Sequence, residues 1–266
     1  MYKAFYSLDT NPFTKELKVK EMFHSSSHQE LQARLKYLKD NRGIGLVVGE
    51  AGSGKTSGLR TFATDLNPAL FKVVYFALAT VSVSDFYRGI AYSLNLEPRF
   101  RKVDLFKQLQ DTINDLYHGK RILPVIILDE MHLASTHFLS DLHLLFNFSM
   151  DSENPFVLIL CGLPHLASKV AVGHHQVLHQ RLIMRYNMMP LTKEETGHYL
   201  THQLELAGAH HPIFSEAAVE AIATVSRGYP RLINSLATGS LIYGFQNDLN
   251  LLDEEAVRQA AINLGI

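Results

Sequence analysis

The chain has 266 residues, 47% of them hydrophobic, so it can bury one large core or two modest ones. Its 25 Lys and Arg nearly balance 26 Asp and Glu, which excludes the strongly basic composition of a stand-alone nucleic-acid-binding protein. The single cysteine, Cys161, excludes an internal disulfide framework. The N-terminus lacks a signal-peptide core, and no run of eighteen apolar residues occurs. We therefore expect a soluble, cytoplasmic protein without a membrane span.

In chain order, the predicted elements begin with an N-terminal segment, 1–43, that packs on the core and contains an amphipathic helix from about residue 27. Strands and helices then alternate: strand 44–48, helix 57–63, strand 71–76, helices 84–96 and 104–117, strand 125–130, strand 156–161 and a less apolar strand 185–189. Apolar runs that alternate with helices indicate a parallel five-stranded sheet covered on both faces.

From Thr192 onward the strand pattern stops and only helical patterns remain. A Thr192-x-x-Glu195 capping box opens the first of them. The four predicted helices are 193–207, 215–226, 230–243 and 253–264. We therefore predict an α/β nucleotide-binding core at 44–191 and a small all-helical lid at 192–266.

One stretch in the first half of the core carries the clearest chemistry, the phosphate-binding loop G-x-x-x-x-G-K-[ST] between a strand and a helix. Its glycines allow backbone N–H groups to converge on a phosphate at a helix N-terminus. Lys55 would reach the β- and γ-phosphates of ATP, and Thr56 would offer its hydroxyl to Mg²⁺. The predicted nucleotide-binding residues are Gly49, Glu50, Ala51, Gly52, Ser53, Gly54, Lys55, Thr56 and Ser57.

Two adjacent carboxylates, Asp129 and Glu130, end the apolar strand 125–130. Asp129 would bind the nucleotide's Mg²⁺ together with Thr56, and Glu130 would polarise the attacking water. A glutamate in this position favours hydrolysis over phosphoryl transfer to a small substrate. The expected cofactors are thus ATP and Mg²⁺.

Several motifs together resemble AAA+ ATPases of the general-secretion A (ExeA-like) type, and the architecture is similar to the transposon target-selector ATPases of the TnsC and MuB kind. The resemblance covers nearly the whole chain. Besides the loop, it is carried by Phe5-x-x-Leu8-x-x-Asn11-Pro12-Phe13, Leu128-Asp129-Glu130, Cys161-Gly162-Leu163-Pro164, Gln180-Arg181-Leu182 and Ser226-Arg227-Gly228-Tyr229-Pro230-Arg231-Leu232-Ile233-Asn234.

The resemblance implies roles for two further catalytic arginines. Arg231 would be the lid (sensor 2) arginine. Arg181 would be the arginine finger that contacts the nucleotide of a neighbouring subunit, and Arg185 is the second candidate for that role. Relatives commonly carry glutamine and glutamate where this chain has Leu163 and His165. Since water alignment would then depend largely on Glu130, we expect slow hydrolysis.

The cluster Arg99, Arg101 and Lys102 is the predicted DNA-binding site, because in DNA-winding relatives this region faces the central pore. Such a cluster can also be a solvated charged loop. The fourteen histidines invite a metal-binding interpretation, but they show no H-E-x-x-H or Cys/His pairing, and exposed positions explain them equally well.

The predicted function is a slowly hydrolysing AAA+ ATPase that assembles as a ring or filament on duplex DNA, without sequence preference, and regulates DNA transposition with a transposase as partner. The alternative is a cytoplasmic ATPase of a general-secretion envelope assembly system. A non-hydrolysing nucleotide-gated module is disfavoured by the Asp129-Glu130 pair. One core with a small lid disfavours a two-motor helicase, although Asp-Glu-Met-His resembles a helicase motif.

Overall fold

The structure is a computed structural model that describes residues 2–14, 16, 18–77 and 82–266. Its contacts divide the chain into two compact units. The sheet unit comprises Glu30–Ala51 and Lys55–Met188, and the helical unit comprises the described residues up to Gln29 together with Gly52–Gly54 and Met189–Ile266. The segment 1–43, which we expected as one piece on the core, is thus divided between the two units after Gln29.

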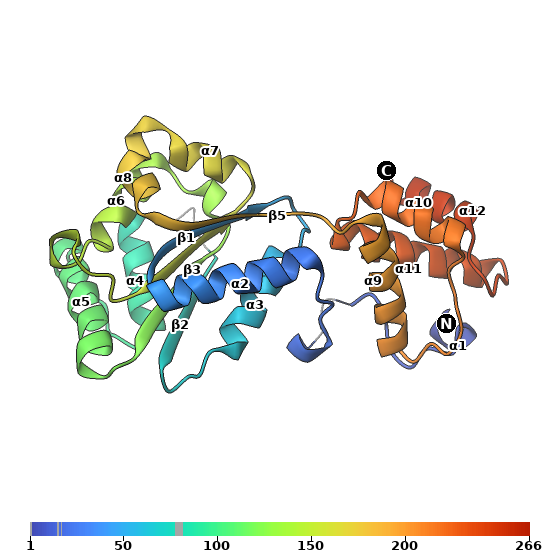
Figure 1. Cartoon of the computed structure of the whole chain (residues 1–266), viewed down its shortest axis with the longest axis horizontal. Coiled ribbons are helices and arrows are strands. Elements are labelled where there is room, and N and C mark those ends of the chain that lie inside the picture. The colour runs from blue at the N-terminus through green and yellow to red at the C-terminus, as the bar shows by residue number, and fades with distance from the viewer. Residues whose placement is uncertain (1, 15, 17, 78–81) are drawn as a thin grey trace. The chain divides into compact units, whose positions relative to one another are not determined.

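A five-stranded sheet, parallel throughout, forms the centre of the sheet unit (Figure 1). Its order is β2-β3-β4-β1-β5, so the first strand lies between the fourth and fifth. The strands are β1 (Gly43–Gly49), β2 (Phe71–Phe76), β3 (Leu123–Leu128), β4 (Val157–Gly162) and β5 (Leu182–Met188). All five lie within a few residues of the predicted strands. This confirms the α/β fold with a parallel five-stranded sheet.

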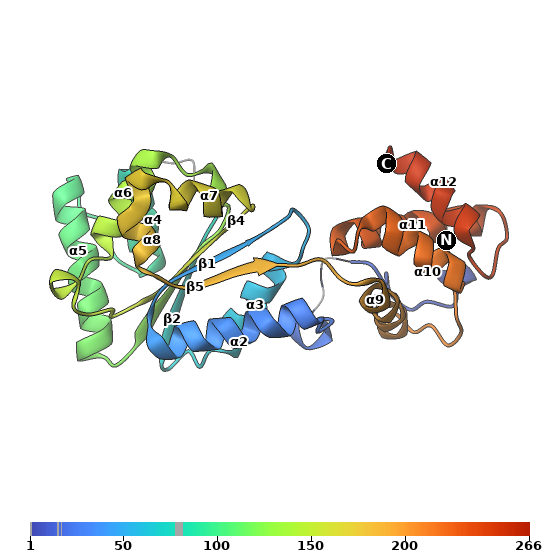
Figure 2. The same cartoon turned by 45° about the horizontal axis from the view of Figure 1, so that its top comes forward.

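Helices cover both faces of this sheet (Figure 2). Alternate strand residues face opposite sides, so Ile126 packs toward one helical layer and Ile127 toward the other. Both are buried, which explains the continuous apolar runs of the sequence. One layer contains α2 (Ser26–Asn41) and α3 (Lys55–Asp65); the other contains α4 (Val83–Ser93), α5 (Lys102–Asn114), α6 (Thr136–Leu145), α7 (His165–Ala171) and α8 (Gln176–Gln180).

The sequence analysis does not predict α6, α7 and α8, which are all short. A local start signal for α6 is nevertheless present, because the Ser135 hydroxyl accepts a hydrogen bond from the Phe138 N–H at 3.1 Å. Phe138, Leu139 and Leu142 then bury one face of the helix. Buried residues of all three helices belong to the hydrophobic core on that face of the sheet.

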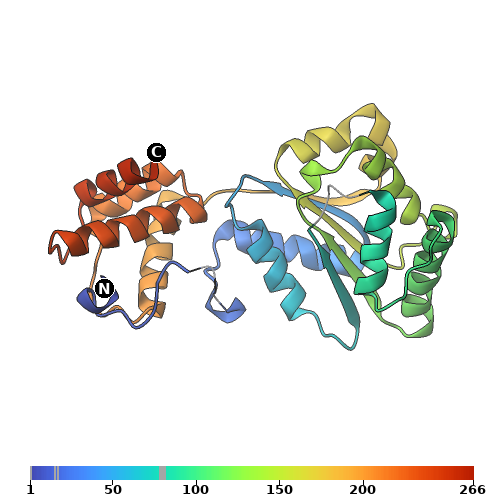
Figure 3. The ribbon, with the colours of Figure 1, turned by 180° about the vertical axis from the view of Figure 1, so that it is seen from behind.

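The helical unit has its own hydrophobic core. Its helices are α1 (Tyr2–Phe5), α9 (Lys193–Leu206), α10 (Glu216–Ser226), α11 (Pro230–Gln246) and α12 (Glu254–Leu264). Figure 3 shows α9–α12 in orange to red, with the N-terminal segment in dark blue beside them. Tyr6, Leu8 and Phe13 of that segment are buried in the core of this unit, and the Tyr6 hydroxyl donates to the Leu249 carbonyl at 2.9 Å.

The predicted capping box is present, and its glutamate also accepts a hydrogen bond from Ser26 within the helical unit. The Thr192 hydroxyl accepts from the Glu195 N–H at 3.1 Å, and the Glu195 carboxylate accepts from the Thr192 N–H at 3.0 Å. The same carboxylate accepts from the Ser26 N–H at 2.7 Å. These bonds to the charged form hold the pKa of Glu195 below its usual value although burial opposes the shift. Among the described residues, no helix has both the length and the apolar character needed to cross a bilayer.

Candidate functional site

The predicted phosphate-binding loop connects β1 to α3 at the carboxyl end of the sheet. β1 is buried along its whole length and ends at Gly49, and α3 begins at Lys55. Between them, Gly52 and Gly54 have φ angles of +80° and +96°. Side chains with a Cβ rarely adopt this conformation, so the loop depends on glycine at both positions. The first turn of α3 comes next in the sequence, and the N–H groups of a helix's first turn have no partner within the helix. Such groups can bind a phosphate.

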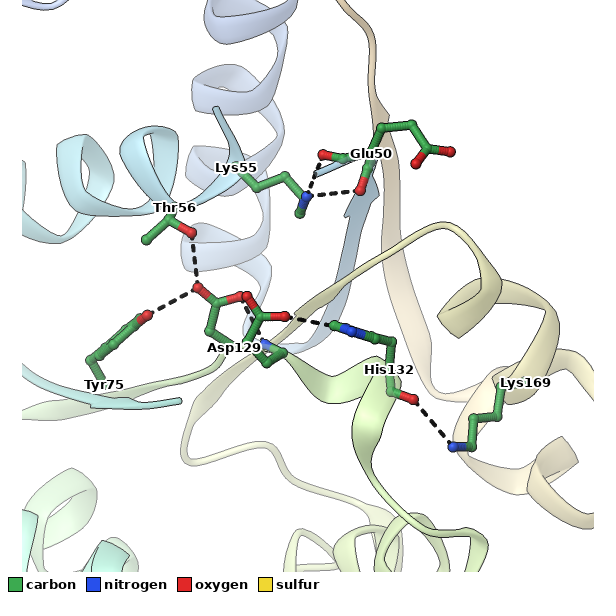
Figure 4. A network of polar contacts seen from close by, with 9 residues as sticks. Glu50, Lys55, Thr56, Tyr75, Asp129, His132 and Lys169 are labelled. Atoms are coloured by element: carbon green, nitrogen blue, oxygen red, sulfur yellow. Dashed lines mark hydrogen bonds and ion pairs between the residues drawn. The ribbon is translucent and has the colours of Figure 1, made fainter. Parts of the chain in front are cut away.

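The Lys55 ammonium group folds back over the loop (Figure 4). Its Nζ donates to the carbonyl oxygens of Gly49 at 2.7 Å and of Glu50 at 2.8 Å. Both acceptors are neutral backbone groups, so these two bonds orient the ammonium without neutralising its charge. The cation is therefore held at the loop where a phosphate group would bind.

Asp129 is the centre of the polar network at this edge of the sheet (Figure 4). Its side chain is fully surrounded, since the residue is only 3% exposed. The Thr56 hydroxyl and the Tyr75 hydroxyl both donate to Oδ2, each at 3.0 Å, and the Glu130 N–H donates to Oδ1 at 2.8 Å. A buried carboxylate requires such partners, and these three come from α3, β2 and the end of β3.

The neighbours of Asp129 stay protonated. Burial, reinforced by the Asp129 carboxylate, raises the pKa of the Tyr75 hydroxyl well above its usual value. Burial likewise raises the pKa of the Cys161 thiol, which is buried on β4, and Asp129 adds to the shift. Tyr75 is thus a permanent donor to Asp129, and Cys161 is a neutral core residue rather than a reactive thiolate.

Glu130 has a different environment from its neighbour. Its backbone is left-handed, with φ 57° and ψ 27°, a conformation that non-glycine residues adopt rarely and often at functional sites. Its side chain is 54% exposed, and the carboxylate Oε2 lies 3.4 Å from Nδ1 of His132. The sheet therefore ends in one carboxylate that is held by donors and one that faces solvent.

The two predicted catalytic arginines lie in different units. Arg181 follows α8 in the sheet unit, and its guanidinium donates to the carbonyls of His143 at 3.1 Å and Phe146 at 2.6 Å. Because these carbonyls end α6, Arg181 acts as a cationic cap for that helix within the chain. Arg185 donates to the His179 carbonyl at 2.8 Å. Arg231 is exposed near the start of α11 in the helical unit.

The predicted DNA-binding cluster lies between α4 and α5. Arg99, Arg101 and Lys102 are all exposed, and so is Phe100 between the two arginines, at 89%. Lys102 pairs with Asp141 at 2.9 Å. Among the described residues, Arg99 and Arg101 take part in no ion pair. The patch thus offers two unneutralised guanidinium groups and one lysine that is already paired.

The histidines of the described part of the chain do not gather around a possible metal ion: no group of three or more His, Cys, Asp or Glu side chains there could hold one. Thr56 and Asp129, in contrast, offer the hard oxygen ligands that Mg²⁺ prefers, and their oxygens are 3.0 Å apart. The donor set therefore fits the predicted ion.

Three side chains of this network are missing from the sequence-based prediction. Tyr75 reaches Asp129 only because β2 and β3 are neighbours, and strand order cannot be read from the motif. Lys169 on α7 donates to the carbonyls of His132 and Ala134. His132 carries a signal, the Asp-Glu-x-His spacing, but in the sequence this spacing indicates only the end of an ATPase strand and resembles a helicase motif.

The chain is similar in sequence to a known protein. The chain is 31% identical over 251 residues to General secretion pathway protein A of Aeromonas hydrophila, a match that covers 92% of this chain and 45% of that protein. The chain thus spans less than half the length of this relative.

Two solved structures share the fold. The crystal structure of Cdc6p from Pyrobaculum aerophilum has a TM-score of 0.71 and 19% identity, and the match covers 95% of this chain and 70% of that one. The structure of Drosophila ORC bound to DNA has a TM-score of 0.72 and 15% identity, covering 100% of this chain and 66% of that one. At these identities the likeness shows the fold alone.

A family match covers the site itself. Residues 38–170 match the family described as AAA domain, and this range includes the phosphate loop, Asp129 and Glu130. It spans half of the chain. The chain therefore belongs to the AAA domain family.

Proposed function

We propose that this protein binds ATP with Mg²⁺ and hydrolyses it slowly at the site formed by the phosphate loop and the carboxyl end of β3. The observation that carries the proposal is the 3.0 Å hydrogen bond between Thr56 and Asp129, because it brings the two expected Mg²⁺ ligands together beside Lys55. The same arrangement leaves the Glu130 carboxylate exposed to water.

Each residue then has a defined task. Lys55 neutralises charge on the β- and γ-phosphates, and the N–H groups of residues 52–57 contact the phosphate oxygens. Thr56 and Asp129 would hold Mg²⁺, which supplies electrostatic stabilisation of the phosphate oxygens when bound. Glu130 accepts the proton of the attacking water as general base. Leu163, half-buried near the end of β4, offers no polar group for this water, which supports a slow reaction.

We also propose that assembly completes the site. Arg231 would contact the γ-phosphate, and Arg181 would act on a neighbouring subunit's nucleotide, where a trans arginine can contribute roughly 10³–10⁵ in rate. The bonds of Arg181 to the end of α6 would then have to be exchanged for the phosphate on assembly, unless Arg185 takes the role.

The test is phosphate release by the purified protein with ATP, with and without Mg²⁺. We expect slow turnover with Mg²⁺ and none after chelation with EDTA, because the phosphate charges then lack their counterion. Restoring Mg²⁺ should restore turnover. Turnover that persists in EDTA would contradict the assigned roles of Thr56 and Asp129, and absence of turnover in every condition would contradict the hydrolysis.

The biological setting has two competing proposals. Similarity to General secretion pathway protein A favours an ATPase of a general-secretion envelope assembly system. Regulation of DNA transposition, with self-association on duplex DNA and a transposase as partner, is supported by the basic cluster and by the resemblance of the motifs. The fold of a DNA-bound ORC protein is compatible with DNA as a partner. A cytoplasmic location remains a prediction for both.

The DNA-binding proposal predicts a defined effect of charge removal. Alanine at Arg99, Arg101 and Lys102 together should weaken ATP-dependent binding to duplex DNA about tenfold or more near physiological salt, equally for all sequences, because phosphate contacts position without specifying. Since Lys102 is paired with Asp141, the two arginines should account for most of the loss. Fluorescence anisotropy over a range of salt concentrations measures this, and the salt dependence should become shallower.

A matched control removes three exposed cations of the helical unit, Lys20, Lys193 and Arg258. This control should bind DNA as the unmodified protein does. If both triple variants lose affinity equally, the cluster is not a specific contact surface. If the unmodified protein binds no DNA in any nucleotide state at low salt, the secretion-type function is favoured.

A further inference from the structure

The proposed mechanism requires that the exposed Glu130 carboxylate be oriented toward the attacking water. A general base has to point at the water it deprotonates, and at 54% exposure its side chain is not held by packing. The Thr56 and Tyr75 hydroxyls and the Glu130 N–H donate to Asp129 instead. The residue usually expected to align the water is also absent, since Leu163 is apolar. Some other group must restrict Glu130.

His132 is placed to do so. Its Nδ1 lies 3.4 Å from Glu130 Oε2, and its side chain is only 10% exposed. That Nδ1 atom is buried and makes no hydrogen bond to any residue the structure describes. A buried polar nitrogen without a partner is costly, so a partner that can move onto it is favoured. A small rotation of the exposed Glu130 side chain supplies that partner.

The backbone of His132 is fixed from the opposite side of the short 3-10 helix η3 (Met131–Leu133). Lys169 of α7 donates to the carbonyl of His132 at 3.4 Å (Figure 4). It also donates to the carbonyl of Ala134. The His165 ring, on the same helix, packs edge-on against the His132 ring at a centroid distance of 5.2 Å. These contacts restrict His132 to one position. They also connect it to the helix that follows β4.

The protonation state of His132 is compatible with donation. Burial, the largest contribution, lowers the pKa of the ring, and the nearby His165 and Lys55 lower it further against the opposing charge of Glu130. The ring is therefore neutral at physiological pH and carries one N–H. An N–H on Nδ1 would satisfy the buried atom by donating to the Glu130 carboxylate, whose Oε2 lies 3.4 Å away.

We propose that His132 is a positioning residue for hydrolysis: its Nδ1–H donates to the Glu130 carboxylate and thereby directs the other carboxylate oxygen at the attacking water. Lys169 acts through His132 by fixing its backbone. This inference rests on the proposed ATP hydrolysis. Catalytic hydrogen bonds are often long without substrate and shorten when it binds, which agrees with a separation of 3.4 Å here.

The test compares His132→Ala with His132→Asn. Alanine removes the donor, and we expect kcat to fall about tenfold with unchanged ATP affinity, as for the loss of one orienting hydrogen bond. The amide nitrogen of asparagine occupies nearly the place of Nδ1, so His132→Asn should restore most of the rate. His137→Ala, at an exposed histidine on α6, is the matched control and should have no effect.

A second comparison separates positioning from a purely structural role. In a double variant, His132→Ala should cause no further loss beyond Glu130→Gln, because the histidine acts only through that glutamate. Nucleotide affinity and melting temperature are measured for every variant. Lys169→Met should repeat the pattern of a lower kcat with unchanged affinity.

The possible outcomes are distinct. Equal kcat for His132→Ala and the unmodified protein overturns the inference and leaves the proposed hydrolysis intact. Equal loss in the alanine and asparagine variants, with weaker ATP binding or a lower melting temperature, also overturns it in favour of a structural role. If the unmodified protein binds ATP without hydrolysing it, the proposed function itself fails, and the positioning role fails with it.

Discussion

Replacing Glu130 with glutamine is expected to reduce ATP turnover by about 10²–10⁴-fold, the usual contribution of a general base, while leaving ATP binding unchanged. The amide has nearly the same size and can take the same left-handed backbone, so the loop and Asp129 keep their positions. It cannot accept the proton of water. Phosphate release and binding of a fluorescent ATP analogue, measured separately, check the two parts of this prediction.

Glu97→Gln is the matched control for this change. Glu97 is an exposed glutamate of the sheet unit, outside the phosphate loop, and it is its backbone carbonyl that accepts from Gln108. The control should therefore hydrolyse ATP at nearly the unmodified rate. Equal losses in both variants would indicate a general effect of the change in charge, and full turnover in Glu130→Gln would show that another group is the base.

The contrast between Asp129 and Glu130 explains how adjacent carboxylates can have separate tasks. Three donors converge on the buried Asp129 and fix its oxygens for a cation. Within the part of the chain that the structure describes, the Glu130 carboxylate is approached only by His132. The backbone of Glu130 is left-handed, and its side chain is exposed where that of Asp129 is buried.

Most of the sheet could be predicted from the sequence because its signals are local. Strands buried on both faces are nearly uninterrupted apolar runs, and β3 and β4 are of this kind. The edge strand β5 was placed three residues late, since its buried and exposed residues alternate and Arg185 interrupts the apolar pattern. Strand order follows from tertiary packing, and nothing in a single strand specifies it.

The same distinction applies to the site. The phosphate loop and the Asp129-Glu130 pair are contiguous motifs, so their proximity required only that strands β1 and β3 be parallel members of one sheet. Tyr75 and Lys169 come from distant segments, and their contacts depend on neighbouring strands and on α7. Short helices such as α7 have too few residues to show a period.

The N-terminal segment illustrates a further limit. Its helix through Leu31, Leu35 and Leu38 was predicted from spacing, and these leucines do pack on the sheet. The preceding Tyr6 and Leu8 belong to the core of the helical unit, more than two hundred residues away in sequence. Apolar residues in the sequence show that a segment is buried, but not which core it joins.

The largest loss of nucleotide affinity is expected from Lys55→Ala. The ammonium group is held over the loop by two neutral carbonyls, so it carries its full charge to the phosphates. Hydrogen bonds to charged groups contribute about 1.5–3 kcal/mol each, so losing two of them to the β- and γ-phosphates should weaken ATP binding by about 10²-fold or more. Turnover at ordinary ATP concentrations should disappear with binding.

Isothermal titration calorimetry with ATP and Mg²⁺ measures this effect, and Lys36→Ala, at an exposed lysine of α2, is the matched control that should bind normally. Circular dichroism should show that Lys55→Ala remains folded, because the lost side-chain bonds go only to two carbonyls at the end of β1, those of Gly49 and Glu50. The variant then distinguishes a phosphate-binding loop from a glycine-rich loop that binds no phosphate. If Lys55→Ala binds ATP as tightly as the unmodified protein, the glycine-rich loop is not a phosphate site despite its geometry. If affinity falls and the fold persists, the charge held by Gly49 and Glu50 is what binds the nucleotide.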